Sequence, residues 1–116
     1  MPFSAGINRV LLMGQIGEEL RWQVISGEHV LCFQFSTTEN IKKGGVAHKH
    51  IEWHSIKVPR ELIRDDAELQ PGDQVYVQGK LQTRIVFENR VKIYKTEVLV
   101  TSFEKLKFSN KLSEAL

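Results

Sequence analysis

The chain has 116 residues, of which 41% are hydrophobic and 26% are charged, which is typical of one small globular domain. Its net charge of +2 is too small to indicate a polyanionic partner, and its single cysteine, Cys32, excludes an intrachain disulfide and a cysteine-based metal site. The sequence has neither a signal-peptide pattern nor an apolar run long enough to cross a membrane, so we expect a cytoplasmic protein.

The distribution of charge is more informative than the total. Residues 41–60 and 74–100 carry an excess of lysine and arginine, whereas residues 61–73 between them carry an excess of acids. A folded domain with this pattern is expected to have faces of opposite charge.

The first half of the chain alternates apolar and polar residues with the period of a β-strand. Strands are expected over residues 7–16, 29–38 and 51–58. An extended segment is expected over residues 20–24 and a turn over residues 26–28. In the second of these strands Leu31, Phe33 and Phe35 share a face and are predicted to be core. Residues 39–49 show no apolar period and contain adjacent glycines, so they are predicted to form a mobile loop.

In the second half, Pro59 is predicted to begin a short helix that ends before Pro71, with Leu62, Ile63, Ala67 and Leu69 near helical spacing. Two strands are expected over residues 74–84 and 91–103, joined by a hairpin at 88–90. The predicted order is three strands, then a short helix, then two strands. Because strands dominate, we predict an all-β fold. A five-stranded Greek-key barrel of the OB type, with the helix between strands 3 and 4, has this order of elements. Periodicity alone leaves another small β-barrel or a sandwich equally open.

The strand over residues 51–58 places a large aromatic on a polar face. Trp53 and Lys57 share this face, while Ile56 lies on the other. An indole in this position either fills a gap in a core or offers a flat apolar surface to a partner. We prefer the second interpretation.

Six segments, in this order, resemble bacterial single-stranded DNA-binding proteins. They are Ile7–Gly17, Leu20–Trp22, Phe35–Glu39, Glu52–His54, Pro71–Arg84 and Tyr94–Val98. Each segment is weak evidence alone, but their shared order and spacing across residues 6–104 is specific. The resemblance implies an OB barrel over residues 1–104 and a short tail over 105–116. It also implies a homotetramer that binds single-stranded DNA in replication, recombination and repair, without catalysis, cofactor or metal.

The chain departs from the family pattern at three aromatic positions and at its end. The family usually carries aromatics near the positions of Ile41, Pro59 and Val86. The glycine-rich tail with an acidic tip, through which family members recruit other genome-maintenance proteins, is also missing from this sequence. We therefore expect a divergent member, such as one encoded by a mobile element, or a primosomal relative.

Single-strand binding without sequence preference uses aromatics that stack on bases and cations that follow the phosphates. The stacking candidates are Trp53, then Trp22 and Phe87, with packing at the barrel rim or within a hairpin as the alternative for the last two. The alternative for each cationic candidate is an ordinary solvated side chain. The phosphate-binding candidates are Lys57, Lys80, Arg84, Arg90, Lys92, Arg9, Lys42, Lys43 and Lys49. The resemblance places His54 and Tyr76 near subunit contacts.

Two other functions stay open at this point. A protein-interaction module with weak nucleic-acid binding is favoured by the missing aromatics and opposed by the basic strands. An RNA-binding OB domain is possible because bases stack alike whichever sugar follows. We expect no enzyme, because no catalytic motif is visible. A metal site at His48, His50 and Glu52, which share a strand face, is a minor alternative.

Overall fold

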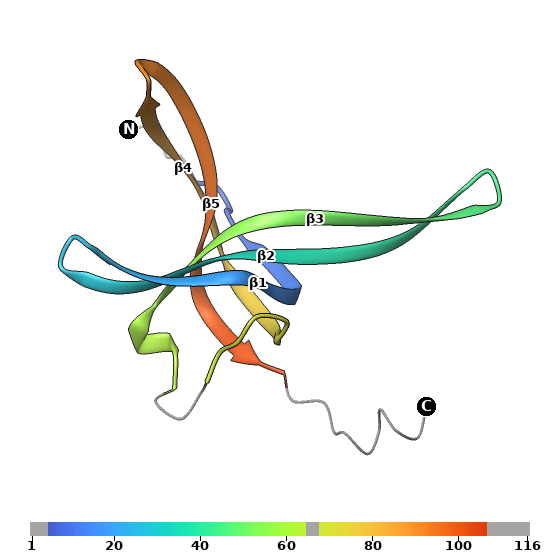
Figure 1. The fold of residues 1–116 in the computed structure, drawn as a ribbon, viewed down its shortest axis with the longest axis horizontal. Coiled ribbons are helices and arrows are strands. Elements are labelled where there is room, and N and C mark those ends of the chain that lie inside the picture. Colours follow the sequence, from blue (N-terminus) through green and yellow to red (C-terminus); the bar gives the residue numbers. More distant parts are fainter. Residues whose placement is uncertain (1–4, 65–67, 107–116) are drawn as a thin grey trace.

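The structure is a computed structural model that describes residues 5–64 and 68–106. Its strands are β1 (Val10–Ile25), β2 (Glu28–Lys43), β3 (Val46–Pro59), β4 (Gln74–Glu88) and β5 (Val91–Lys105). They close into a barrel in the order β1-β2-β3-β5-β4 (Figure 1). All neighbouring strands are antiparallel except β3 and β5, which run parallel. The prediction of an all-β, five-stranded barrel is confirmed.

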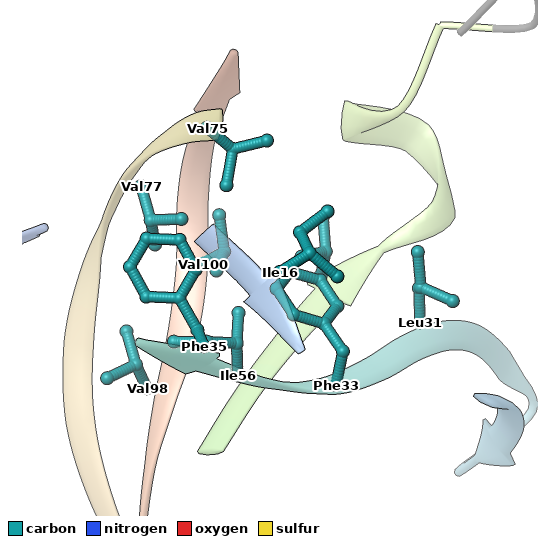
Figure 2. Close-up of a cluster of buried hydrophobic side chains, with 10 residues drawn as sticks. Ile16, Leu31, Phe33, Phe35, Ile56, Val75, Val77, Val98 and Val100 are labelled. Carbon is teal, nitrogen blue, oxygen red and sulfur yellow. The ribbon is translucent and has the colours of Figure 1, made fainter. Parts of the chain in front are cut away.

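Buried apolar side chains from all five strands fill the barrel, and Figure 2 shows how they converge. Leu31, Phe33 and Phe35 are buried, as the alternation along β2 predicted, and Phe35 is fully enclosed. The rings of Phe33 and Phe35 meet edge to face with centroids 6.4 Å apart, a favourable geometry for aromatic pairs. The core therefore fixes which face of each strand points outward.

Three hairpins extend beyond the barrel as two-stranded ribbons (Figure 1). The β2–β3 ladder continues without interruption to the pair Lys43 and Val46, and Gly44 and Gly45 close it with positive φ angles of 59° and 81°. The prediction of a loop over residues 39–49 is therefore wrong. The apolar period is missing because neither face of the ribbon is covered by the core, and not because the strands end.

The connection between β3 and β4 is less helical than predicted. In the described part of the chain it contains one 3-10 turn over Arg60–Leu62, and Ile63 is already extended. The expected helical position of Ala67 lies outside the described residues. Leu62, Ile63 and Leu69 nevertheless pack against the core, so their apolar character indicated burial and not helical hydrogen bonding. No helix among the described residues is long and apolar enough to span a membrane.

Glycines allow strands to cross closely at the barrel corners. A Cβ atom at Gly14 would overlap the carbonyl oxygen of Ser36, and one at Gly79 would overlap that of Leu99. The β4–β5 register shifts between Gln78 and Gly79, which is where β4 bends out of the barrel. Such bends direct the ribbons and, with them, the candidate site residues.

Candidate nucleic-acid interface

Trp53 lies on the outer face of β3, opposite Ser36 of β2, and 58% of the residue is exposed. One edge of its indole lies against β1, because a Cβ atom built on Gly17 would come within 3.2 Å of the ring carbon Cζ3. Gly17 itself is buried. The ring is thus supported by backbone on one side and open to solvent on the other. This is the arrangement of a surface for stacking and not of a core side chain.

The β2–β3 ribbon continues the face of Trp53 away from the barrel. The uninterrupted register and the alternation of side chains place Ile51, Lys49 and Lys42 on this same face. Lys43, the neighbour of Lys42, lies on the opposite face. Because the predicted loop is a ribbon, its lysines divide between two defined faces, and only two of them follow the indole.

The histidines of this ribbon lie on the face away from Trp53. The Nε2 atom of His50 lies 2.9 Å from a carboxylate oxygen of Glu52, and both groups are exposed. The described residues contain no cluster of three or more side chains arranged to hold a metal ion. His54, at the mouth of the barrel, forms a hydrogen bond of 2.9 Å with the hydroxyl of Thr37.

A groove of about 260 Å³ crosses the outer face next to Trp53 and is lined by all five strands. Its lining residues are Glu19, Arg21, Gln23, Cys32, Phe33, Gln34, Ser55, Ile56, Lys57, Arg84, Lys95 and Glu97. At the end nearest Trp53, the amide of Gln34 donates a hydrogen bond of 2.9 Å to the hydroxyl of Ser55. Trp53 is not itself a lining residue, but a Cβ atom on Gly17 would contact both Gln34 and the Trp53 ring, so the indole adjoins this end of the groove.

Glu97 lies in the floor of this groove between two cations. Its carboxylate is 3.1 Å from the Nζ atom of Lys57 and 3.0 Å from the Nε atom of Arg84. The exposed fractions of the Glu97, Lys57 and Arg84 side chains are 8%, 11% and 52%. Burial raises the pKa of Glu97, but hydrogen bonds from the two cations outweigh it and hold that pKa below its ordinary value. Lys57, a predicted phosphate contact, is thus engaged below the surface, whereas Arg84 remains half open.

The two faces of the β4–β5 ribbon carry different side chains. Lys80 and Arg84 lie on the groove face, whereas Phe87 and its cross-strand partner Lys92 lie on the opposite face. Tyr94 shares the face of Phe87, both rings are more than 60% exposed, and the Nζ atom of Lys92 lies 5.3 Å from the Tyr94 ring centroid. The sequence analysis did not name Tyr94 as a site residue. Its position two residues after Lys92 on the same strand places both side chains on one face, and this could have identified it.

The structure does not bring Trp22 together with Trp53. Trp22 pairs with Leu31 on the core side of the sheet, the face that it shares with Ile16 and Leu20. The irregularity between Ile16 and Leu20 adds two residues to β1 and leaves the alternation of its faces unchanged. The ribbon has left the barrel at this point, and Trp22 is 53% exposed. The two indoles therefore lie on opposite faces.

The remaining predicted cations lie at the edges. The guanidinium of Arg9 donates to the side-chain oxygen of Gln78 at 2.8 and 3.1 Å, with the Gln78 amide turned to accept. The neighbouring Asn8 exchanges two side-chain hydrogen bonds with the backbone of Leu81, which extends the β1–β4 edge. Arg90 occupies the tip of the β4–β5 ribbon with a positive φ of 64°.

The structure also shows where the three positions lie at which the family resemblance implies aromatics. Ile41 lies on the face of the β2–β3 ribbon opposite Trp53, Pro59 ends β3, and Val86 lies on the groove face of the β4–β5 ribbon with Arg84. The stacking surface on the groove side thus depends mainly on Trp53.

A larger hollow, of about 540 Å³, lies away from this surface. Its lining residues are Glu28, His29, Pro59, Arg60, Glu61, Ile63 and Arg64. Acidic and basic side chains are mixed there, and its described lining carries no Phe, Tyr or Trp side chain. We therefore regard the Trp53 groove as the better candidate site.

Comparison with known proteins agrees with this geometry. Residues 7–106 match the Single-strand binding protein family. The chain is 35% identical over 108 residues to single-stranded DNA-binding protein 1 of Chlorobaculum tepidum, an alignment that covers 89% of this chain and 67% of that protein.

Solved structures show the same fold. The Plasmodium falciparum SSB, in complex with ssDNA, is 27% identical with a TM-score of 0.77, over 91% of this chain and all of that one. The small single-stranded DNA-binding protein of Streptomyces coelicolor has a TM-score of 0.66 at 15% identity, over 84% of this chain and 92% of that one, which is a likeness of fold alone. From the match over residues 7–106 and the 35% identity, the chain belongs to the Single-strand binding protein family.

Proposed function

We propose that this protein binds single-stranded DNA without sequence preference, through the outer face that carries Trp53 and the adjoining groove. The observation that carries the proposal is the indole itself, which is supported by Gly17 and open on its other side. Family membership and the names of the matched relatives support it. The protein would act where single strands arise in the cytoplasm, during replication, recombination and repair.

The path of the strand follows the charges. A base stacks on Trp53, and the phosphates on one side of it approach Lys49 and Lys42 along the β2–β3 ribbon. On the other side the strand crosses the groove toward Arg84 and Lys80. A stacked base is worth about 1–3 kcal/mol and tolerates any base, because every base offers a π-face.

Phe87 and Tyr94 provide a second stacking surface on the other face of the β4–β5 ribbon. Lys92 lies between them and supplies a cation for the backbone. A strand that uses both surfaces passes around the edge of this ribbon. Wrapping of this kind offsets the loss of the three aromatics that the family resemblance leads one to expect.

We infer further that copies of the chain assemble, most simply as a homotetramer. Support comes from the N-terminal half of β1, where Leu11 and Met13 are 54% and 65% exposed on the outer face. Met13 pairs with Tyr76 of β4, one of the two residues that the resemblance assigns to subunit contacts, and His54 is the other. An apolar patch of this kind on a small protein is typical of an interface.

The test is binding of a fluorescently labelled oligo-dT, followed by anisotropy, together with quenching of tryptophan emission. Trp53→Ala is expected to raise Kd about 5- to 150-fold, the equivalent of 1–3 kcal/mol of stacking. Trp22→Ala is the matched control, since that indole is equally exposed but on the opposite face, and it should leave Kd close to wild type and the quenching intact. A duplex of the same length should bind far more weakly.

Two outcomes decide against the proposal. Absence of binding to oligo-dT even at low salt would refute it and would leave an OB module that contacts other proteins. Preferential competition by oligo-U would favour an RNA ligand instead.

A further inference from the structure

A carboxylate in the floor of a groove proposed for a polyanion is an unexpected feature. Glu97 is the one charged residue that is buried in the described part of the chain, at 7% exposure. It lies on β5, in parallel register with Ser55 of β3, at the centre of the groove. A surface evolved only for maximal attraction to phosphates would not carry a negative charge at this point.

The contacts of Glu97 show what its charge does. One carboxylate oxygen accepts from Arg84 Nε at 3.0 Å, and the other lies 3.1 Å from Lys57 Nζ and 3.4 Å from Arg84 Nη2. Lys57 is enclosed with it and has little surface left for another anion. Arg84 uses two of the five donors of its guanidinium, so the others remain for an acceptor in the groove.

We propose that Glu97 is an internal counter-anion that takes the place of a phosphate between Lys57 and Arg84, and thereby limits the affinity and the salt dependence of single-strand binding. This inference rests on the proposed function. With Glu97 ionised, the cluster of Lys57, Arg84 and Glu97 carries a single net positive charge. The other charged lining residues, Glu19, Arg21 and Lys95, are the same in every variant below. Because the cations hold the pKa of Glu97 below its ordinary value, this balance persists at neutral pH.

The size of the effect follows from counterion release. Removing the carboxylate charge makes one more cation available to the strand, which steepens the slope of log K against log salt by about 0.7. Extrapolated from 1 M salt, where the release term vanishes, this corresponds to about 8-fold tighter binding at about 50 mM salt. The gain should therefore shrink steadily as salt is added.

The experiment measures Kd for a labelled oligo-dT between about 50 mM and 1 M salt in wild type and four variants. Glu97→Gln keeps the shape and hydrogen-bonding oxygen but removes the charge, and it is expected to bind about 8-fold tighter at the lowest salt. Glu104→Gln, on the same strand but exposed and outside the groove lining, is the matched control and should change Kd by less than 2-fold.

Two variants keep the test decisive if Glu97→Gln folds poorly. Lys57→Met leaves Arg84 paired with Glu97 and should bind about 8-fold more weakly, with a slope about 0.7 shallower. The double variant, Lys57→Met with Glu97→Gln, leaves Arg84 alone and therefore restores the single positive charge. Its Kd and slope should return to those of wild type. Thermal unfolding of every variant identifies any that is not folded at the assay temperature.

The outcomes separate this inference from the proposed function. A wild-type protein that does not bind oligo-dT overturns the function. A wild-type protein that binds, with Glu97→Gln no tighter than Glu104→Gln, overturns the role of Glu97 and leaves the function intact. Equal affinities of Lys57→Met and the double variant overturn it as well.

Discussion

The two faces of the β2–β3 ribbon give a prediction in which neighbouring lysines behave differently. Lys42 and Lys49 lie on the face of Trp53, whereas Lys43, adjacent to Lys42 in sequence, lies on the reverse face. We expect Lys42→Gln and Lys49→Gln each to weaken binding of oligo-dT and Lys43→Gln to have little effect. All three changes remove one exposed charge from the same ribbon, so they differ only in the direction of the side chain.

The magnitude follows from the number of phosphates that the face can neutralise. Each lysine that contacts a phosphate contributes about −0.7 to the salt slope, equivalent to about 8-fold in Kd at about 50 mM salt. The double variant of Lys42 and Lys49 should therefore lose about 1.4 of slope and about 65-fold in Kd under the same conditions. The assay is anisotropy of a labelled oligo-dT over a salt series, with thermal unfolding to confirm that the ribbon change leaves the barrel intact.

Equal losses for Lys43→Gln and Lys42→Gln would refute the reasoning. They would mean that the ribbon acts through its total charge and that no face of it tracks the strand.

Three further predictions concern stability and access. Gly79→Ala should lower the stability by about 1–3 kcal/mol or more, because its methyl group would overlap the Leu99 carbonyl, whereas Gly6→Ala, with open space around it, should not alter the melting temperature. The folded-state pKa of Glu97 is lowered, so its stabilisation is complete above its ordinary value of 4.5 and is lost as the pH falls through the folded-state pKa. The difference in melting temperature between wild type and Glu97→Gln should therefore shrink in acid, and a constant difference would contradict this. Cys32 lines the groove, and bound oligo-dT should slow its reaction with a maleimide; an unchanged rate would place the strand elsewhere.

The barrel could be predicted from sequence because each strand within it has one covered face. Alternation then identifies the core directly, as it did for Leu31, Phe33 and Phe35. Outside the barrel this signal disappears, since both faces of a ribbon meet solvent. Residues 39–49 therefore read as a loop although they form a continuous ladder.

The site was predicted less completely, for two physical reasons. Alternation along β1 places Trp22 on the same face as Ile16 and Leu20, but it does not show that the β1–β2 ribbon has left the barrel at Trp22 and leaves the indole 53% exposed, away from Trp53. Pairing between distant strands is also invisible in a single sequence. Alternation gave the correct outer face for Lys57, but nothing in the sequence indicated that β5 would bring Glu97 to it.

The ribbons also make this molecule unusually open for its length. Its radius of gyration is 17.3 Å, compared with about 13 Å expected for a compact chain of this size. Two-stranded ribbons are marginally stable in water by themselves, so local stability should decline from the barrel toward each tip. Amide hydrogen exchange would then divide the backbone into a slowly exchanging barrel and rapidly exchanging ribbons.

That gradient has a consequence for recognition. The ribbon arms lose conformational freedom when a ligand holds them, so part of the contact energy is spent on ordering and the affinity per contact is modest. In return, arms of low local stability are expected to adjust to strands of different curvature. A rigid cleft would select one conformation of a flexible polymer, whereas arms of this kind would accept several.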